Sequence, residues 1–480
     1  MIIMGINETT HDASVSLIEG NRILFAGHAE RYSKQKNDWF TNRELIDNAL
    51  QYGKPDLIAY YEHPLLKKTR IAISGGFGGD EPRFKDHEEL ANVPVKYFSH
   101  HQSHAAAGYY TSRFDDAVIV VLDAIGEWNT STIWVGEGEK LKRVYKKNYP
   151  FSFGLFYSAF TQLIGLKPNE EEYILMGMAG YGNPDIHYNR VREYFSSISS
   201  QKYNFHKGII DWDKNISELD KFNIAASVQK VYEERLMEFM SFAIKKTGKR
   251  NLVFMGGCAL NASANTRLWE LFSDVWIMPN PGDSGSSLGA AAAALGSHLV
   301  WKGPYLGNQI DSRAYPSKAI LARILEDGVA PVAYGRAEFG PRALGNRSIL
   351  ADPRDPDIKD KVNRIKKREL FRPFAPVIME EHLHEWFEAS ASSPYMQYTF
   401  RCKQPLKIPS VVHADGTSRV QTVNKKQHPG LYETLRMFYV ETGIPLLLNT
   451  SLNIKGQPLL NDERDIIDWE EAYGQKVIRG

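Results

Sequence analysis

The stretch that organises the chain is Val95-Lys96-Tyr97-Phe98-Ser99-His100-His101-Gln102-Ser103-His104-Ala105-Ala106-Ala107-Gly108-Tyr109-Tyr110. Its centre is the pattern His100-x-x-x-His104, and residues four apart lie on one face of a helix, about one turn from each other. Two imidazoles so placed bind one metal ion when other segments supply further ligands. An isolated pair at this spacing is more often structural, so the rest of the chain has to provide the missing ligands.

A strand, a polar loop and a hairpin occur twice in the N-terminal half. Residues 2–6 form a short apolar run, a polar loop covers 7–12, and residues 13–27 alternate as a hairpin. The same plan returns as an apolar strand over 117–122, an acidic loop that starts with Asp123, and a hairpin over 130–145. Such a repeat is the organisation of actin-like ATPases, in which loops at strand ends face a nucleotide cleft. We therefore expect the loops after the first strand of each half to lie in one site.

Two later loops carry residue types suited to a nucleotide and a cation. A buried strand over 252–255 is followed by Gly256-Gly257-Cys258-Ala259-Leu260-Asn261, and paired glycines allow backbone amides to approach a phosphate or adenosine. A strand over 275–278 precedes a Gly/Ser-rich turn with Asp283 at the start of a helix. A helix start favours anions, while Asp283 offers a carboxylate to a cation.

The C-terminal part differs in composition and is basic in two places. Residues 302–316 are rich in Gly and Pro and are the expected linker. A glycine-rich loop then holds Arg336, Arg342 and Arg347, and residues 359–372 add seven basic side chains. Arginine binds phosphate and carboxylate through two parallel hydrogen bonds, so a phosphate pocket and a solvated basic face are both open interpretations.

The bulk composition excludes several classes. The net charge of +1 gives no global field for a nucleic acid or a membrane, and the two cysteines form no disulfide framework or thiolate metal motif. The N-terminus has no signal-peptide pattern and no stretch has transmembrane length. We expect a cytoplasmic enzyme, in a bacterium or in the host cell of a virus, and the oligomeric state stays open.

Strings along most of the chain resemble the O-carbamoyltransferases of the NodU/CmcH type, also described as TobZ-like. They are Thr10-His11-Asp12-Ala13-Ser14, Ala29-Glu30-Arg31, His100-His101-Gln102-Ser103-His104-Ala105, Gly256-Gly257-x-Ala259-Leu260-Asn261, Pro281-Gly282-Asp283, Gly340-Pro341-Arg342-Ala343-Leu344-Gly345-Asn346-Arg347-Ser348, Phe371-Arg372-Pro373-Phe374-Ala375-Pro376 and Asn449-Thr450-Ser451. The resemblance implies a duplicated actin-like (ASKHA, TsaD-like) domain over 1–301 and a YrdC-like α/β domain over 317–480.

The family chemistry then becomes an expectation for this chain. The YrdC-like domain would join carbamoyl phosphate and ATP, with Mg²⁺, into carbamoyl-adenylate. The first domain would hold Fe(II), or another divalent metal, and pass the carbamoyl group to an acceptor hydroxyl. By motif position the metal ligands would be His100, His104, Asp123 and Asp283, and His11 and Lys36 would face the transfer site. The expected nucleotide and carbamoyl phosphate ligands are Gly256, Gly257, Asn261, Arg342, Arg347, Lys366, Arg372, Thr417, Arg419, Asn449 and Ser451.

Two points stay open at this stage. His11 has two interpretations, as the base that takes the proton of the hydroxyl or as a hydrogen-bond partner of the adenylate. The sequence also has Ile174 where the family usually has a lysine, which puts one anion contact in doubt.

The acceptor is undecided between a hydroxylated small molecule, such as a sugar or a natural product, and a hydroxymethylated pyrimidine (5-hydroxymethylcytosine) in DNA. The basic and aromatic residues of the segment 31–40 favour a base as partner, and their alternative role is a family loop around Lys36. A tRNA threonylcarbamoyl-type transferase and a non-enzymatic actin-like ATPase are the remaining alternatives, and the C-terminal strings argue against both.

Overall fold

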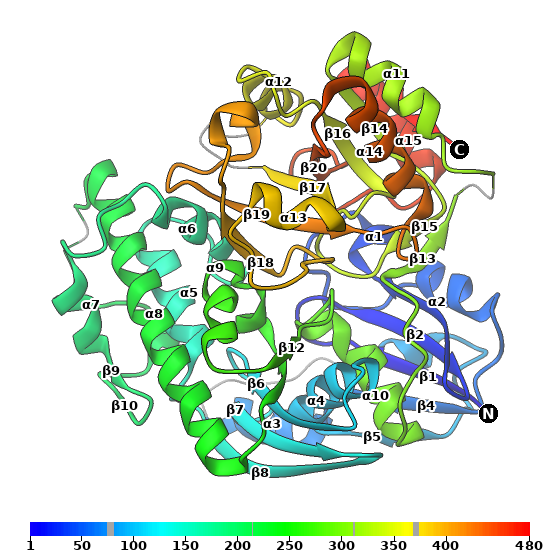
Figure 1. Cartoon of the computed structure of the whole chain (residues 1–480). Helices are drawn as coiled ribbons and strands as arrows, with labels where there is room; N and C mark the ends of the chain where they lie inside the picture. Colours follow the sequence, from blue (N-terminus) through cyan, green and yellow to red (C-terminus); the bar gives the residue numbers. More distant parts are fainter. Residues whose placement is uncertain (74–80, 214, 311–312, 368–373) are drawn as a thin grey trace. The chain divides into compact units, whose positions relative to one another are not determined.

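The computed structural model describes residues 1–73, 81–213, 215–310, 313–367 and 374–480 (Figure 1). These residues form two compact units. The first unit consists of Met1–Leu24 and Trp39–Trp301, and the second of Phe25–Asp38 and Lys302–Gly480. Among the described residues, none of the helices combines the length and the apolar character that a membrane span requires.

The first unit contains two sheets with the same strand order. One sheet has the order β3-β2-β1-β4-β5 and the other, read from its hairpin edge, β8-β7-β6-β11-β12. In each, the first strand pairs antiparallel with the hairpin strand that follows it and parallel with a later strand. The strands are β1 (Ile2–Asn7), β2 (Ser14–Glu19), β3 (Arg22–His28), β4 (Leu57–Tyr60), β5 (Val95–Tyr97), β6 (Asp116–Leu122), β7 (Asn129–Glu137), β8 (Lys140–Asn148), β11 (Asn251–Met255) and β12 (Asp274–Trp276). The predicted duplication of an α/β half is therefore confirmed.

Helices follow the last strand of each sheet and pack on one another. These are α4 (His100–Thr111) after β5 and α10 (Ser286–Leu295) after β12. Alanines and glycines dominate α10 and form the middle of α4, and almost every residue of α4 is buried because these small side chains let it pack between neighbouring elements. The closest approach is at Gly289, where a Cβ atom would lie 1.8 Å from the carbonyl oxygen of Ser103. This contact fixes the distance between the two helices.

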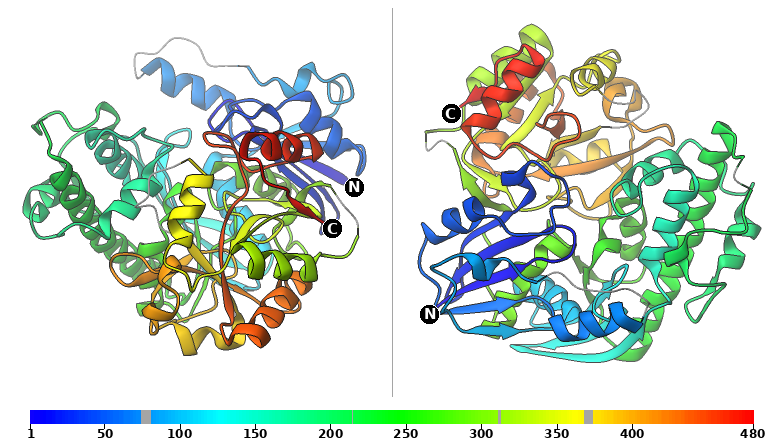
Figure 2. Two further views of the ribbon diagram at one scale, coloured as in Figure 1. Left: turned by 90° about the horizontal axis from the view of Figure 1, so that it is seen from above. Right: turned by 180° about the vertical axis from the view of Figure 1, so that it is seen from behind.

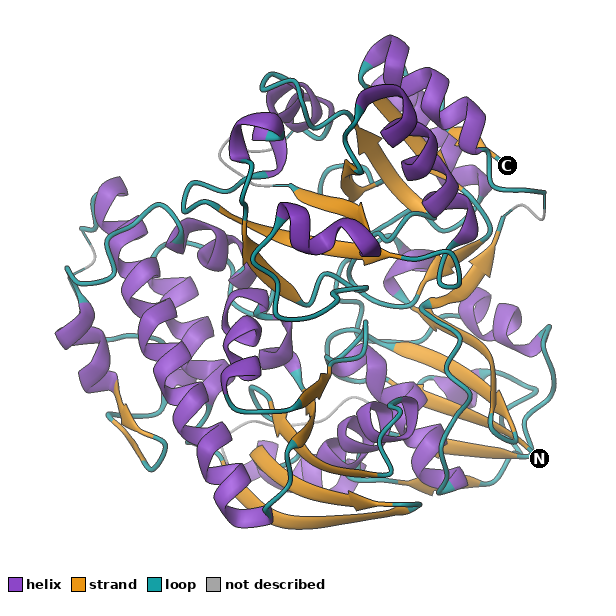
Figure 3. Cartoon of the chain, viewed as in Figure 1, coloured by secondary structure: helices purple, strands orange, loops and turns teal. Residues whose placement is uncertain are grey.

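Several other helices of the first unit gather around its long helix, α8 (Glu218–Thr247) (Figures 2 and 3). Helix α8 starts at the Ser217 cap and ends at Gly248 in the left-handed conformation. The unit also contains α2 (Arg43–Leu50), α3 (Pro64–Ile73), α5 (Phe153–Leu163), α6 (Glu172–Ala179), α7 (Tyr188–Tyr194) and α9 (Ala262–Thr266). The segment 195–222 forms the short hairpin β9 (Phe195–Ser197) and β10 (Ser200–Gln201) and the first turn of α8.

The second unit is built on one larger mixed sheet. Its strand order is β18-β19-β17-β20-β16-β14-β21, and the strands are β14 (Val329–Ala333), β16 (Arg347–Ala351), β17 (Ala375–Met379), β18 (Tyr398–Arg401), β19 (Thr417–Val423), β20 (Leu446–Ser451) and β21 (Ile478–Arg479). Helices α11 (Ser317–Asp327), α12 (Ile358–Ile365), α14 (Pro429–Thr442) and α15 (Glu463–Tyr473) accompany it. The amino ends of α14 and α15 are capped by His428 and Asp462.

Two segments of the second unit differ from the sequence-based outline. The interval 302–316 contains β13 (Tyr305–Gln309), which pairs with β15 (Arg336–Glu338), because Leu306 and Gly307 are buried despite the polar, Gly/Pro-rich surroundings. Residues 25–38, with α1 (Glu30–Ser33), group with the C-terminal part although they lie early in the sequence. There Arg31 donates to the carbonyl of Gly340 at 2.8 Å, and Lys34 pairs with Asp465.

Candidate metal centre and active site

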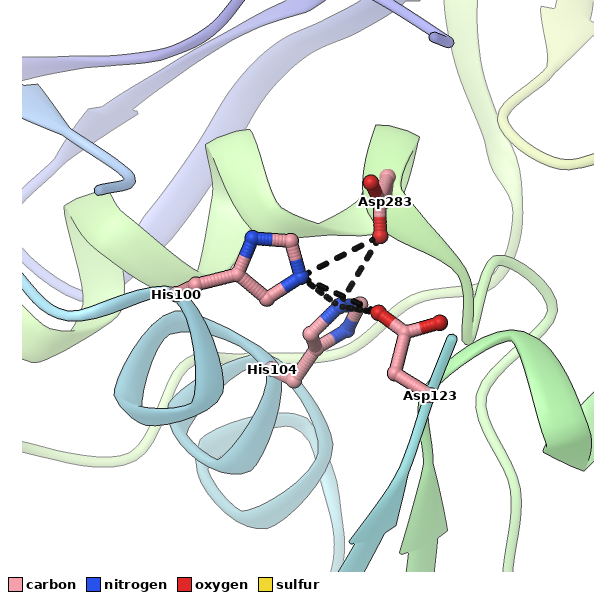
Figure 4. A group of neighbouring side chains, drawn as sticks. All are labelled: His100, His104, Asp123 and Asp283. Carbon is pink, nitrogen blue, oxygen red and sulfur yellow. Dashed lines mark hydrogen bonds and ion pairs between the residues drawn. The ribbon is translucent and has the colours of Figure 1, made fainter. Parts of the chain in front are cut away.

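Four buried side chains of the first unit converge on one point (Figure 4). His100 and His104 come from consecutive turns of α4, Asp123 follows β6, and Asp283 precedes α10. One ligand atom from each lies within 4.8 Å of all the others. The duplicated fold thus brings together the four residues that the motifs suggested as metal ligands.

The donor atoms are spaced as one metal ion requires. His104 Nε2 lies 3.1 Å from His100 Nε2 and 3.2 Å from Asp283 Oδ1, and His100 Nε2 lies 3.0 Å from Asp123 Oδ2. When two neighbouring ligand atoms each lie about 2.1 Å from the same ion, the distance between these two atoms is about 3 Å. Two imidazoles and two carboxylates are a donor set suited to Fe(II) and to other divalent first-row metals. The residues present therefore fit a metal.

The electrostatics of the cluster favour a bound cation. Burial alone would lower the pKa of His100, but the charges of Asp283 and Asp123 outweigh it and raise this pKa well above its ordinary value. Burial would likewise raise the pKa of Asp123, whereas its contacts with His100 and His104 hold it well below the usual range. Both carboxylates are thus ionised, and an ionised pair this close to two imidazoles attracts either protons or a metal cation.

Backbone amides and a second carboxylate hold the ligands in place. Asp123 Oδ1 accepts from the amides of Ala124 at 2.8 Å and Gly257 at 3.3 Å. Glu127, which is buried, accepts from the amide of His100 at 3.0 Å and so ties the first turn of α4. Gly256 has φ +91°, and a Cβ atom there would lie 2.1 Å from the carbonyl oxygen of Leu122. The glycine pair therefore supports the Asp123 carboxylate, a role that strand-and-loop patterning did not predict.

His11 lies at the edge of this cluster. Its Nε2 is 3.8 Å from Asp283 Oδ2, its Nδ1 is 3.0 Å from Asp12 Oδ2, and its side chain is 38% exposed. It is thus both next to the metal ligands and open to a substrate. Lys36, the other residue expected at the transfer site, is an exposed residue of the second unit. Ile174 is half-buried on α6.

Asn261 was expected at the nucleotide, and the structure shows it in a hydrogen-bond network. Its amide exchanges two hydrogen bonds with Gln229, at 2.9 and 3.0 Å, and its Oδ1 caps α9 through the amide of Ala264. Tyr157 donates to Gln229 Oε1 at 2.8 Å, and burial holds the pKa of this phenol well above its ordinary value. Asn261 therefore organises the loop that follows β11.

In the second unit the predicted residues form three local groups. Lys366 Nζ donates to the backbone oxygen of Ser451, to Ser451 Oγ at 3.0 Å and to Asn453 Oδ1 at 2.8 Å. Asn449 donates to Gln421 Oε1 at 2.6 Å and to the carbonyl of Ala343 at 3.1 Å. Asn453 and Gln421 were not predicted, and only their place beside Ser451 and Arg419 in the sequence points to them.

The third group surrounds His413. Thr417 Oγ1 lies 3.4 Å from His413 Nδ1. Burial, with the positive charges of Arg419 and Lys359, lowers the pKa of His413 to about 4, although Asp415 opposes the shift. Arg419 and Lys359 thus both act on His413, and arginine and lysine are the residue types that bind anions.

The arginines of the glycine-rich loop behave differently from one another. Arg347 is fully buried, and its two terminal nitrogens donate to backbone oxygens of Tyr334, Asn346, Asn308, Gly335 and Asn461. Those nitrogens shape the loop, and Glu338 assists by accepting from the amides of Leu344, Asn346 and Arg347. Arg342 is half-exposed, and Arg372 lies outside the described residues.

Family models match residues in both units of the chain. Residues 61–292 match the model of the carbamoyltransferase N-terminus and residues 322–478 that of the carbamoyltransferase C-terminus. The 3'-hydroxymethylcephem-O-carbamoyltransferase of Amycolatopsis lactamdurans is 30% identical over 97% of this chain and 95% of its own length. The chain belongs to the carbamoyltransferase family.

Other relatives of the chain are nodulation proteins. Nodulation protein NolO of Bradyrhizobium diazoefficiens is 32% identical over 77% of this chain and 75% of its own length, and nodulation protein U of Rhizobium tropici is 29% identical over 98% and 94%. Among solved structures, full-length HypF in a phosphate- and nucleotide-bound form covers 61% of this chain and 46% of its own, with 14% identity and a TM-score of 0.35. The family membership establishes the chain as an enzyme, which removes the non-enzymatic alternative.

Proposed function

We propose that the chain is an ATP-dependent O-carbamoyltransferase that works in two steps. The second unit, as a YrdC-like domain, hydrolyses carbamoyl phosphate with one water to carbamate and phosphate, and the carbamate oxygen then attacks the α-phosphate of ATP to give carbamoyl-adenylate and pyrophosphate. The first unit transfers the carbamoyl group from the adenylate to an acceptor hydroxyl and releases AMP. The observation that carries this proposal is the convergence of His100, His104, Asp123 and Asp283 in a chain whose family transfers carbamoyl groups.

Basic side chains of the second unit suit the first step. Lys366 with Ser451, and Arg419 with Lys359, offer cationic and hydroxyl donors to carbamoyl phosphate and to the triphosphate of ATP, with Mg²⁺. Thr417 lies in the group around His413 and Asn449 in the group with Gln421, and Arg342 and Arg372 complete the proposed anion ligands. Arg347 contributes by holding the loop rather than through its terminal nitrogens.

The first unit supplies the proton transfer of the second step. Iron held by the two histidines and two aspartates would polarise the carbamoyl carbonyl as a Lewis acid. His11 accepts the hydroxyl proton as the oxygen attacks the carbamoyl carbon and the bond from that carbon to the AMP oxygen breaks. Asp12 fixes the orientation of the imidazole through Nδ1, so Nε2 faces the reacting hydroxyl. Gly256, Gly257 and Asn261 remain proposed contacts of the nucleotide, and Lys36 remains a proposed catalytic residue.

A hydroxylated small molecule is our first choice of acceptor, because the named relative with nearly full-length similarity acts on a hydroxymethyl group of a cephem. A hydroxymethylated pyrimidine in DNA is the second. In the segment 31–40, whose basic and aromatic residues favour a base as partner, Arg31 is buried and Lys34 is paired with Asp465. Lys36 and Trp39 are exposed. The basic and aromatic character available to a base is thus smaller than the sequence suggested.

One experiment tests both steps. The chain is incubated with carbamoyl phosphate, ATP, Mg²⁺ and Fe(II), and pyrophosphate is measured. Acceptors are then added in parallel, namely an aminosugar, a chitooligosaccharide, a hydroxymethyl cephem and DNA with 5-hydroxymethylcytosine, and mass spectrometry looks for the gain of one carbamoyl group. Absence of pyrophosphate refutes the adenylate mechanism. Two results together support the division between the two units. Pyrophosphate forms without Fe(II), and the carbamoylated product forms only when Fe(II) is present.

A further inference from the structure

The loop that carries His11 is held in a conformation that its residues rarely adopt. Thr9 has φ +70° and Asp12 has φ +67°. A β-branched residue such as threonine is disfavoured there because its side chain collides with the backbone. Such a conformation persists only when surrounding contacts determine it, and it is common at functional sites. The contacts of Thr9 therefore indicate what keeps His11 in place.

Lys67 of α3 provides two of those contacts, beside the hydrogen bond from the Thr9 amide to the carbonyl of Trp39 at 2.6 Å. Its ammonium group donates to the carbonyl of Thr9 at 2.6 Å, to Thr9 Oγ1 at 3.0 Å and to Glu62 Oε1 at 2.7 Å. A lysine ammonium has three N–H donors, so all three are used, and two of them bind Thr9. The Lys67 and Glu62 side chains are only 11% and 2% exposed. A buried ammonium is costly unless it is paired, so this geometry is strongly specified.

Hydrogen bonds also hold the loop on both sides of Thr9. Glu8 accepts from the amide and hydroxyl of Thr41 and from the amide of Phe84, at 2.8 to 3.2 Å. Asn7 donates to the backbone carbonyls of Asp12 and Asp283, both at 2.9 Å. His11 lies between these anchors, 3.8 Å from the carboxylate of Asp283. Between Glu8 and Asp12, Lys67 is the charged side chain that fixes the backbone.

We propose that Lys67, paired with Glu62, is a positioning residue for carbamoyl transfer, because it locks the backbone at Thr9 and thereby presents His11 to the acceptor hydroxyl beside Asp283. Lys67 touches neither substrate nor metal ligand in this role, and it acts through Thr9. The inference rests on the proposed part of His11 in the transfer step, whereas adenylate formation belongs to the second unit and does not need Lys67.

The test removes the ion pair without leaving a buried charge. Lys67→Met alone would leave the Glu62 carboxylate unpaired, so the double variant Lys67→Met/Glu62→Gln is compared with the wild type. The matched control is Lys68→Met, since Lys68 is the next residue of the same helix and its salt bridge with Glu81 is exposed. All variants are measured with Fe(II), Mg²⁺, ATP, carbamoyl phosphate and the acceptor that the wild type carbamoylates.

Three results are expected of the double variant. Amide hydrogen exchange of a peptide covering residues 8–12 increases at least tenfold, while exchange in α4 stays within twofold of the wild type. The turnover number for transfer falls about 100-fold, as for other displacements of a catalytic group by about 1 Å, with the KM for carbamoyl phosphate within twofold. Pyrophosphate release is unchanged, and Lys68→Met behaves as wild type.

A rescue separates positioning from a general loss of structure. In Lys67→Cys, alkylation with 2-bromoethylamine restores an ammonium group at nearly the same distance, and both native cysteines are buried. Recovery of exchange protection and transfer by at least tenfold supports the proposal. Unchanged exchange of residues 8–12 in the double variant, or unchanged transfer, overturns it, as does alkylated protein that is folded but not rescued. A wild type that releases no pyrophosphate would refute the adenylate mechanism instead, and the exchange experiment would still decide the role of Lys67.

Discussion

Gly289→Ala tests whether the packing of two helices sets the geometry of the metal centre. The new Cβ atom would lie 1.8 Å from the carbonyl oxygen of Ser103, 2.7 Å from its carbonyl carbon and 2.9 Å from Cβ of Ala107. Non-bonded carbon atoms are comfortable at about 3.5 Å or more, so α4 and α10 have to separate by more than about 1 Å. Gly289 itself contacts no proposed ligand.

This displacement is large on the scale of metal coordination. Ser103 lies between His100 and His104 on α4, and Asp283 lies just before α10, so the separation lengthens the present 3.2 Å between His104 Nε2 and Asp283 Oδ1. A functional site tolerates only about 0.2 Å in each metal–ligand distance. We therefore expect the bound iron to fall below one-tenth of the wild-type content and transfer to fall about 100-fold. The strain of the additional methyl group should cost about 1–3 kcal/mol in the free energy of unfolding.

The assay compares iron content by elemental analysis, pyrophosphate release, carbamoyl transfer and urea unfolding. Ala293→Gly is the matched control, because a glycine in α10 lowers stability by about 1 kcal/mol without bringing α10 closer to α4. That variant should keep its iron. If Gly289→Ala binds iron and transfers the carbamoyl group like the wild type, the packing of α4 on α10 does not set the centre. If both variants lose iron equally, general weakening of α10 explains the loss.

Other changes separate the two steps and probe stability. His104→Ala should abolish transfer and leave pyrophosphate release intact, and loss of both activities would contradict either the metal assignment or the division of steps. Lys366→Met should reduce pyrophosphate release at least tenfold while the iron content is unchanged, because Lys366 lies beside Ser451 in the second unit. Burial lowers the pKa of His428 to about 4, and its Nδ1 accepts from the amide of Leu431 at the start of α14, so the folded protein keeps it neutral. Since the unfolded chain binds a proton near pH 6.5, His428 should reduce stability as the pH falls from 6.5 to 4, by up to about 3 kcal/mol. Urea unfolding across this range should show a smaller pH dependence in His428→Asn, which keeps a capping side chain, and an unchanged dependence would exclude His428 as the cause.

Local patterns in the sequence predicted much of the architecture. The alternating and apolar runs identified both hairpins and the first strand of each half, and the spacing of His100 and His104 placed them on one face of a helix, as found. The strand β13 was not predicted, because its residues are polar and its stability comes from pairing with β15, far along the chain. The periodicity of a short segment gives no information about a partner strand that lies far along the chain.

Side-chain roles were harder to predict than the elements that carry them. Arg347 has the residue type and the loop of a phosphate ligand, yet its terminal nitrogens bind carbonyl oxygens from three separate segments, at Asn308, at Tyr334 and Gly335, and at Asn461. The pair of Lys67 and Glu62 gave no signal in the sequence, since a lysine five residues after a glutamate is ordinary on a surface. In both cases burial decides the role, and burial depends on contacts between residues that are distant in sequence.

The two halves carry corresponding carboxylates after their first strands, and these carboxylates have different surroundings. Glu8 follows β1 as Asp123 follows β6, so the two carboxylates occupy corresponding places in sheets of the same strand order. Asp123 directs Oδ2 toward His100, whereas both oxygens of Glu8 are occupied by Thr41 and Phe84. Burial raises the pKa of Glu8, although those hydrogen bonds oppose the shift. One copy of the loop thus offers a carboxylate to a cation, and the other uses its carboxylate to anchor the backbone that carries His11. Under the proposed mechanism the repeat therefore supplies two parts of a single transfer site, a metal ligand and the loop of the base, rather than two equivalent sites.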